Sequence, residues 1–196
     1  MRIYVEHAKS KEQAGIRDLL NYALESGDNI FQKPAKKLLD IGCSYSGSLF
    51  VKEYKKLFPQ TSTFHLDEKL IPLQFEHDSD NKICADARRL SIRDASVDMI
   101  NASYFPGVSR STGRDYSKIF DEIYRILIPD GLFFFNYDCG DSFEDLRDAI
   151  YKSGFSYLRH LARIDCNTDP IDMFVAIKGV AECSVNSMLK NHKTKL

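Results

Sequence analysis

One short stretch constrains the fold of this chain more than any other, because it runs an apolar strand directly into a turn of small residues. Residues 37–41 read as a buried strand, and residues 48–58 resume with helical periodicity. Between them, bulk is kept out of the turn by Gly42, Ser44, Ser46 and Gly47. The N-terminus of the following helix therefore faces whatever lies above the strand, which predicts a site for a nucleotide-like cofactor.

The rest of the chain alternates in the same way between short apolar runs and helical patterns. Helices are predicted over residues 12–24, 48–58, 115–127 and 142–153. Strands are predicted over residues 37–42, 62–67, 81–85, 96–102, 131–137, 155–163 and 171–178, with a turn at Pro129-Asp130-Gly131. Such alternation predicts an α/β protein with a doubly wound, mostly parallel sheet. No helix separates the last two strands, so they are expected to form an antiparallel hairpin.

Size and composition favour one domain. With 196 residues and 43% hydrophobic residues, the chain is long enough for one sizeable core. We expect a single domain over residues 1–180, with a helical N-terminal cap over residues 1–30. Residues 181–196 have weak periodicity and a basic end, which predicts a flexible tail.

Charge and cysteine usage narrow the partners and the compartment. Lys and Arg number 27 against 28 Asp and Glu, so no global basic field exists to attract nucleic acid or an anionic membrane. The five cysteines are widely spaced, and no histidine or cysteine falls at metal-ligand spacing, so free thiols and no metal site are expected. The charged start of the chain and the lack of a long apolar run predict a cytoplasmic protein.

Acidic residues close three successive predicted strands. Asp40 lies just before Gly42 at the first strand, Asp67 ends the second, and Asp86 follows the third. In an open α/β sheet, ligands bind at the carboxyl ends of the strands. A carboxylate after the second strand can accept hydrogen bonds from the two hydroxyls of a ribose, and one after the third can accept from the amine of a base. Together these positions indicate an adenosine group.

With these residues in place, the chain resembles the class I S-adenosylmethionine-dependent methyltransferases, specifically the small, single-domain, type 11-like kind. The resemblance extends over about residues 37–178. It depends on Leu39-Asp40-Ile41-Gly42-Cys43, Leu66-Asp67, Ala85-Asp86-Ala87, the strand at residues 96–100 and the helix-turn-strand at residues 123–131. It implies a Rossmann-like fold with a seven-stranded sheet, and methyl transfer by direct displacement.

The resemblance also implies a cofactor, S-adenosyl-L-methionine, and a set of residues that bind it. The turn formed by Gly42, Cys43 and Ser44 is expected to pass close to the methionine part, with Asp40 in support. Asp67 is expected to hold the ribose, and Asp86 with Ala87 is expected to lie beside the adenine. The acceptor is expected to be a small molecule, and the sequence distinguishes no catalytic base.

Two departures keep other functions open. Ser44 and Ser46 stand where glycine is usual in the family, so a non-catalytic or degenerate binding protein of the same fold is one alternative. The other is an NAD(P)-dependent oxidoreductase, because Gly42-x-Ser44-x-x-Gly47 resembles a dinucleotide-binding turn whose middle glycine is replaced. That glycine lets a pyrophosphate approach the backbone, so its replacement disfavours this second alternative.

Overall fold

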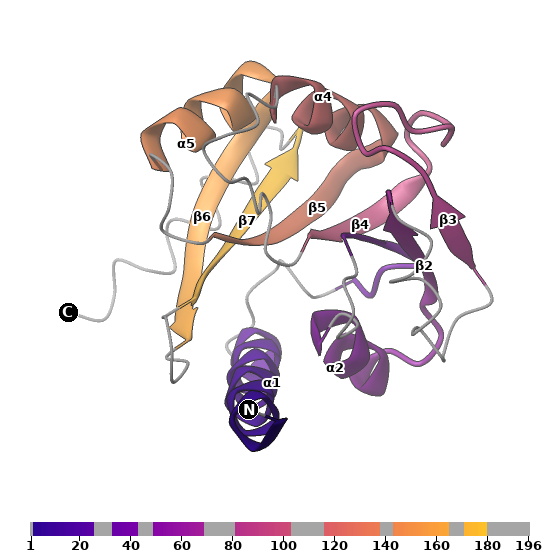
Figure 1. Cartoon of the computed structure of the whole chain (residues 1–196). Coiled ribbons are helices and arrows are strands. Elements are labelled where there is room, and N and C mark those ends of the chain that lie inside the picture. Colours follow the sequence, from indigo (N-terminus) through magenta and orange to yellow (C-terminus); the bar gives the residue numbers. More distant parts are fainter. Residues whose placement is uncertain are drawn as a thin grey trace.

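The computed structural model shows one mixed seven-stranded sheet between two layers of helices (Figure 1). It describes residues 2–25, 33–42, 49–68, 81–102, 116–137, 143–164 and 171–179. The described helices are α1 (Arg2–Glu25), α2 (Leu49–Leu57), α4 (Tyr116–Ile126) and α5 (Phe143–Lys152). The strands are β1 (Lys37–Ile41), β2 (Ser62–Asp67), β3 (Lys82–Cys84), β4 (Val97–Ala102), β5 (Leu127–Tyr137), β6 (Phe155–Ile164) and β7 (Ile171–Lys178).

The strand order is β3-β2-β1-β4-β5-β7-β6, which is the doubly wound arrangement that the sequence predicts. The chain runs outward from β1 to β3, returns to pair β4 with β1, and then builds the other half of the sheet. The first five strands in the sequence pair in parallel, whereas β7 pairs antiparallel with both β5 and β6. The predicted C-terminal hairpin is therefore confirmed, and the order of the strands reverses between β1 and β4.

Alternate residues of the strands contribute to two separate hydrophobic cores, because successive side chains of a strand point to opposite faces of the sheet. On one face, Leu39 and Ile41 belong to the core covered by α4 and α5. On the other face, Leu38 packs with Ile16 of α1 and Phe50 of α2. The N-terminal helix thus forms part of a layer beside α2, on the face opposite to α4 and α5 (Figure 1).

Two element boundaries differ from the sequence-based prediction by more than one residue. Helix α1 begins at Arg2 rather than at residue 12, because the residues before Glu12 include good helix formers that do not continue the apolar stripe used to predict it. Strand β5 begins at Leu127, directly after α4, rather than at residue 131. Pro129-Asp130-Gly131 therefore lies inside β5, where the register to β4 shifts and Asp130 has a φ of 61°.

The connection from β3 to β4 contains no described helix and is held to α4 by side chains. The guanidinium of Arg125 donates to the carbonyl oxygens of Leu90 and Ile92, each at 2.8 Å. Glu122 accepts a hydrogen bond of 2.6 Å from the backbone nitrogen of Leu90. The hydrogen bond from Arg125 also lowers the pKa of the Glu122 carboxyl. These contacts let a short connection reach β4 while the carboxyl end of β3 stays open.

Candidate cofactor site at the carboxyl edge of the sheet

Strand pairing brings three of the predicted site residues to one edge of the sheet. The backbone nitrogen of Gly42, at the end of β1, donates to the carbonyl oxygen of Leu66 in β2 at 2.8 Å. The backbone nitrogen of Ala85, just after β3, donates to the carbonyl oxygen of Asp67 at 3.1 Å. Gly42, Asp67 and Asp86 therefore follow one another across the carboxyl ends of β1, β2 and β3.

Gly42 has the backbone geometry that a turn close to a ligand requires. Its φ is +70°, in the left-handed region that side chains other than glycine rarely adopt. A Cβ atom placed on it would meet no described atom within 4 Å. No described atom therefore occupies the space beside the backbone of Gly42.

Asp67 and Asp86 supply carboxylates of the required chemistry at this edge. Asp67 is half-buried at the end of β2. Asp86 is 43% exposed, and both of its carboxylate oxygens accept hydrogen bonds from the guanidinium of Arg88. It also accepts from the backbone nitrogen of Arg88, so it closes its own turn, and this carboxylate raises the pKa of the Arg88 guanidinium. Carboxylate oxygens accept hydrogen bonds, and ribose hydroxyls and an adenine amine are donors that can pair with such acceptors.

Asp40 lies in β1, two residues before Gly42, and is completely buried. Its carboxylate accepts a hydrogen bond from the side-chain amide of Asn101 in β4 at 2.7 Å and contacts Nδ1 of His65 in β2 at 3.2 Å. The three residues share one register level, because His65 and Asn101 are the partners of Asp40 on its two neighbouring strands. This cluster joins the three strands directly behind Gly42.

Sequence reasoning did not find this three-residue cluster. His65 reads from the sequence as a structural residue of an apolar strand, and nothing there couples it to Asn101. The available signal is the position of each residue within its strand, but the register that pairs them depends on packing between distant segments. Cys43 and Ser44, which were also predicted to bind the cofactor, lie outside the described residues, and Ala87 is half-buried against the core beneath α4.

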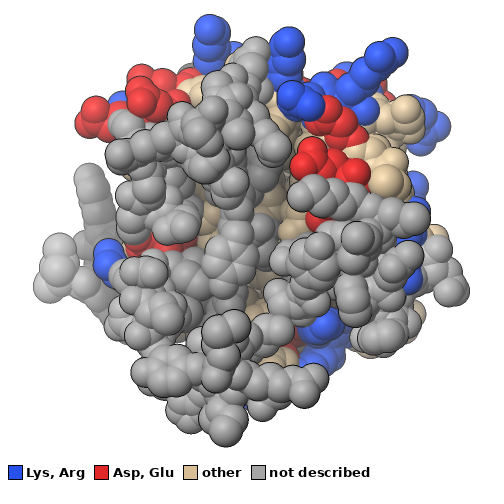
Figure 2. Space-filling view, in the orientation of Figure 1, with Lys and Arg blue, Asp and Glu red and all other residues tan. Residues whose placement is uncertain are grey.

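The surface and the described helices add few further constraints. Figure 2 shows basic and acidic side chains interspersed among the described residues of one face. None of the described helices combines the length and the apolar character needed to cross a lipid bilayer. Within the same described ranges, no group of three or more His, Cys, Asp or Glu side chains is arranged to hold a metal ion.

Comparisons with known proteins agree with this fold. A family model described as a methyltransferase domain matches residues 39–135, which begin in β1 and end in β5. A search of curated protein sequences found no match.

Solved structures share the fold at low sequence identity. A candidate O-methyltransferase from Nostoc punctiforme superposes with a TM-score of 0.64 at 15% identity, over 90% of this chain and 60% of that one. Magnesium protoporphyrin IX methyltransferase from Synechocystis, solved with bound S-adenosylmethionine, has a TM-score of 0.63 at 9% identity, over 91% of this chain and 85% of that one. A methyltransferase from Archaeoglobus fulgidus has a TM-score of 0.58 at 16% identity, over 83% of this chain and 94% of that one.

Several similar structures are considerably longer than this chain. The chain spans 60% of the Nostoc protein, and it spans 50% and 52% of two further methyltransferase structures with the same fold.

Proposed function

Because the chain belongs to the class I S-adenosylmethionine-dependent methyltransferase family, we propose that it transfers a methyl group from this cofactor to a small-molecule acceptor. The observation that carries the proposal is the alignment of Gly42, Asp67 and Asp86 along the carboxyl ends of β1, β2 and β3. This edge lies beside the point where the strand order reverses, which is where open α/β sheets bind ligands.

Each of these residues has a distinct role in the proposed site. The backbone at Gly42 lets the methionine part approach the turn, together with Cys43 and Ser44. The carboxylate of Asp67 accepts hydrogen bonds from the two ribose hydroxyls. Asp86 and Ala87 lie beside the adenine. Asp40 acts from behind as a positioning residue, because its contacts with His65 and Asn101 hold the end of β1 in place.

When bound, S-adenosylmethionine would supply a methyl group on its sulfonium, which an acceptor could attack at the methyl carbon with S-adenosylhomocysteine as the leaving group. The chain's own contribution to this reaction is alignment and exclusion of water. Its three strand ends orient the nucleoside part, and the buried cluster behind them keeps the edge rigid. Since burial removes Asp40 from solvent, this carboxylate serves the geometry of the turn rather than proton transfer to an acceptor.

A small molecule is the acceptor class that we propose. A near-neutral chain has no global field to attract a nucleic acid. Among the proteins of similar fold, one is named for a porphyrin substrate and another was solved with phosphomonomethylethanolamine, so the fold serves small acceptors in those proteins. We also propose that residues 1–180 act as one domain, since α1 and β7 contribute to the same core cluster.

One observation favours a non-catalytic binding protein as the second candidate. Both carboxylate oxygens of Asp86 accept hydrogen bonds from Arg88, so an adenine amine must share or replace this partner. If that replacement is too costly, the site holds the cofactor weakly and the fold serves a binding role instead.

Calorimetric titration with S-adenosylmethionine and S-adenosylhomocysteine tests the proposal. We expect micromolar binding by the wild type and loss of at least about tenfold in affinity for Asp67→Ala, which corresponds to about 1.4 kcal/mol. Asp148→Ala is the matched control, because Asp148 is an exposed aspartate of α5 with its side chain 71% exposed. Absence of binding by a folded wild type would overturn the proposed function. Binding without methyl transfer to any of a panel of acceptors would favour the second candidate.

A further inference from the structure

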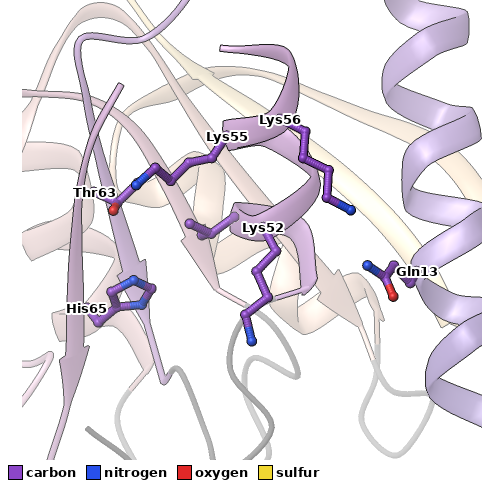
Figure 3. Close-up of a pocket in the computed structure, with 7 residues that line it drawn as sticks. Gln13, Lys52, Lys55, Lys56, Thr63 and His65 are labelled. Carbon is purple, nitrogen blue, oxygen red and sulfur yellow. The ribbon is translucent and has the colours of Figure 1, made fainter. Parts of the chain in front are cut away.

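A groove of about 550 Å³ lies on the α1 and α2 face of the sheet, separate from the cofactor edge (Figure 3). None of Gly42, Asp67 and Asp86 lines it. It is lined instead by Gln13 of α1, by Val51, Lys52, Lys55 and Lys56 of α2, and by Thr63 and His65 of β2. Its volume lies within the range of small-molecule sites.

The wall formed by α2 carries positive charge that the described residues do not neutralise. Lys52 and Lys55 are half-buried, and neither makes an ion pair with any residue of the described ranges. Lys56 differs, because its Nζ lies 2.5 Å from a carboxylate oxygen of Glu53. Figure 3 shows the same division, since Lys55 extends towards Thr63 on β2 whereas Lys56 extends towards α1. Among the described residues, none that lines the groove carries a carboxylate.

The opposite wall of the groove is formed by β2 and presents polar side chains. The side chain of His65 is 5% exposed, and its Nδ1 contacts the carboxylate of Asp40. Its other ring nitrogen, Nε2, has no hydrogen-bond partner among the described residues, and the ring lines the groove. Thr63 is also buried, and Figure 3 shows its hydroxyl at the same wall. The β2 wall of the groove therefore consists of polar side chains.

We propose that this groove binds a small molecule that carries a phosphate group. Lys52 and Lys55 supply two positive charges to the groove, the number that balances a phosphate dianion, and a lysine ammonium forms a strong, charge-assisted hydrogen bond to a phosphate oxygen. Thr63 supplies a hydroxyl donor. The part of the groove that the phosphate leaves free accommodates the organic part of the ligand. The proposal concerns a second site and does not depend on the proposed methyl transfer.

Calorimetric titration of the full chain with glycerol 3-phosphate, at constant ionic strength in a phosphate-free buffer, tests the proposal. We expect saturable binding at one site, and affinity at least about tenfold lower in Lys52→Gln/Lys55→Gln, which corresponds to about 1.4 kcal/mol. The matched control is Lys118→Gln/Lys152→Gln. It removes the same charge from two exposed lysines of α4 and α5, on the opposite face of the sheet.

Three results would overturn this assignment. The first is the absence of saturable binding, which would show that the groove holds no phosphate. The second is equal weakening in the two double variants, which would show only a general charge effect. The third is competition between glycerol 3-phosphate and S-adenosylhomocysteine, which would place the phosphate at the cofactor edge. Circular dichroism confirms that each variant is folded, and the single variant Lys55→Gln gives the same comparison with a smaller change to α2. Loss of S-adenosylhomocysteine binding alone would contradict the proposed function and leave the phosphate site intact.

Discussion

Asp40 and His65 contact each other across two parallel strands, with Oδ2 and Nδ1 3.2 Å apart and both side chains buried. Asn101 completes the arrangement from the other side of β1. The contact links the two sites, because Asp40 lies two residues before the turn at Gly42 and the ring of His65 lines the phosphate groove. A buried polar cluster of this kind is stable only while every member is satisfied.

Removing the carboxylate of Asp40 should therefore destabilise the fold. Asp40→Ala removes one acceptor of the Asn101 amide and the partner of Nδ1 of His65 from the core, and each group left unsatisfied costs about 1–3 kcal/mol. Asp40→Asn should cost less, since its amide oxygen still accepts from Asn101 and the histidine tautomer can change. Urea denaturation measures both, with the exposed Asp148→Ala expected within about 0.5 kcal/mol of the wild type. Equal losses for the two Asp40 variants would contradict the account of the cluster.

Glu53 of α2 accepts three hydrogen bonds, and the two from Gln13 and Arg17 connect it to α1. Burial opposes its ionisation, but donors from Arg17, Lys56 and Gln13 outweigh burial and lower the pKa of its carboxyl to about 2. A lowered pKa in the folded state means that the carboxylate contributes stability above its unfolded pKa of about 4.5, and that this stability is lost as the pH falls towards 2.

The stability difference between the wild type and Glu53→Gln should consequently depend on pH. We expect it to be largest above about pH 4.5 and to shrink steadily as the pH falls towards 2, because only the wild type takes up the proton. Urea unfolding at a series of pH values measures the difference. A difference that stays constant between pH 7 and pH 3 would show that Glu53 acts through packing alone.

A substitution at Gly42, compared with the same substitution at Gly179, separates the effect of backbone strain from the effect of cofactor contact. Gly42→Ala places a side chain at a φ of +70°, which costs about 1 kcal/mol or more. Gly179 is a matched control, since its φ is +66° and a Cβ there also meets nothing within 4 Å. We expect similar losses of thermal stability in Gly42→Ala and Gly179→Ala, but weaker S-adenosylhomocysteine binding only in Gly42→Ala. Unchanged binding in both variants would remove Gly42 from the proposed cofactor site.

Lys178 of β7 caps the carboxyl end of α4. Its Nζ donates to the carbonyl oxygens of Tyr124 and Leu127 at 2.6 and 2.7 Å, and it lies 4.5 Å from the centre of the Tyr124 ring. Burial lowers the pKa of this ammonium. Lys178→Met should cost about 1–3 kcal/mol in urea denaturation, because the last carbonyls of the helix lose their donor. Lys152→Met, at an exposed position of α5, should change stability by less than about 0.5 kcal/mol.

The elements of the fold follow from local patterns, but several of their boundaries do not. Strand β2 and strand β7 begin and end where periodicity predicts, because their apolar alternation is bounded by polar turns. The start of β5 is different. Leu127 pairs with Val97, and Lys178 takes the carbonyl oxygen of the same residue, so distant segments end the helix and begin the strand at this point.

The sequence by itself determined the order of strands and helices, the small-residue turn at Gly42, and the acidic residues after successive strands. These are local properties of hydrophobic spacing and turn chemistry. Only the tertiary structure decided that Asp40, His65 and Asn101 form one buried cluster, and that Lys52, Lys55, Thr63 and His65 line one groove. Such contacts depend on the register between strands and on the seating of α2, which the packing of residues far apart in the chain determines.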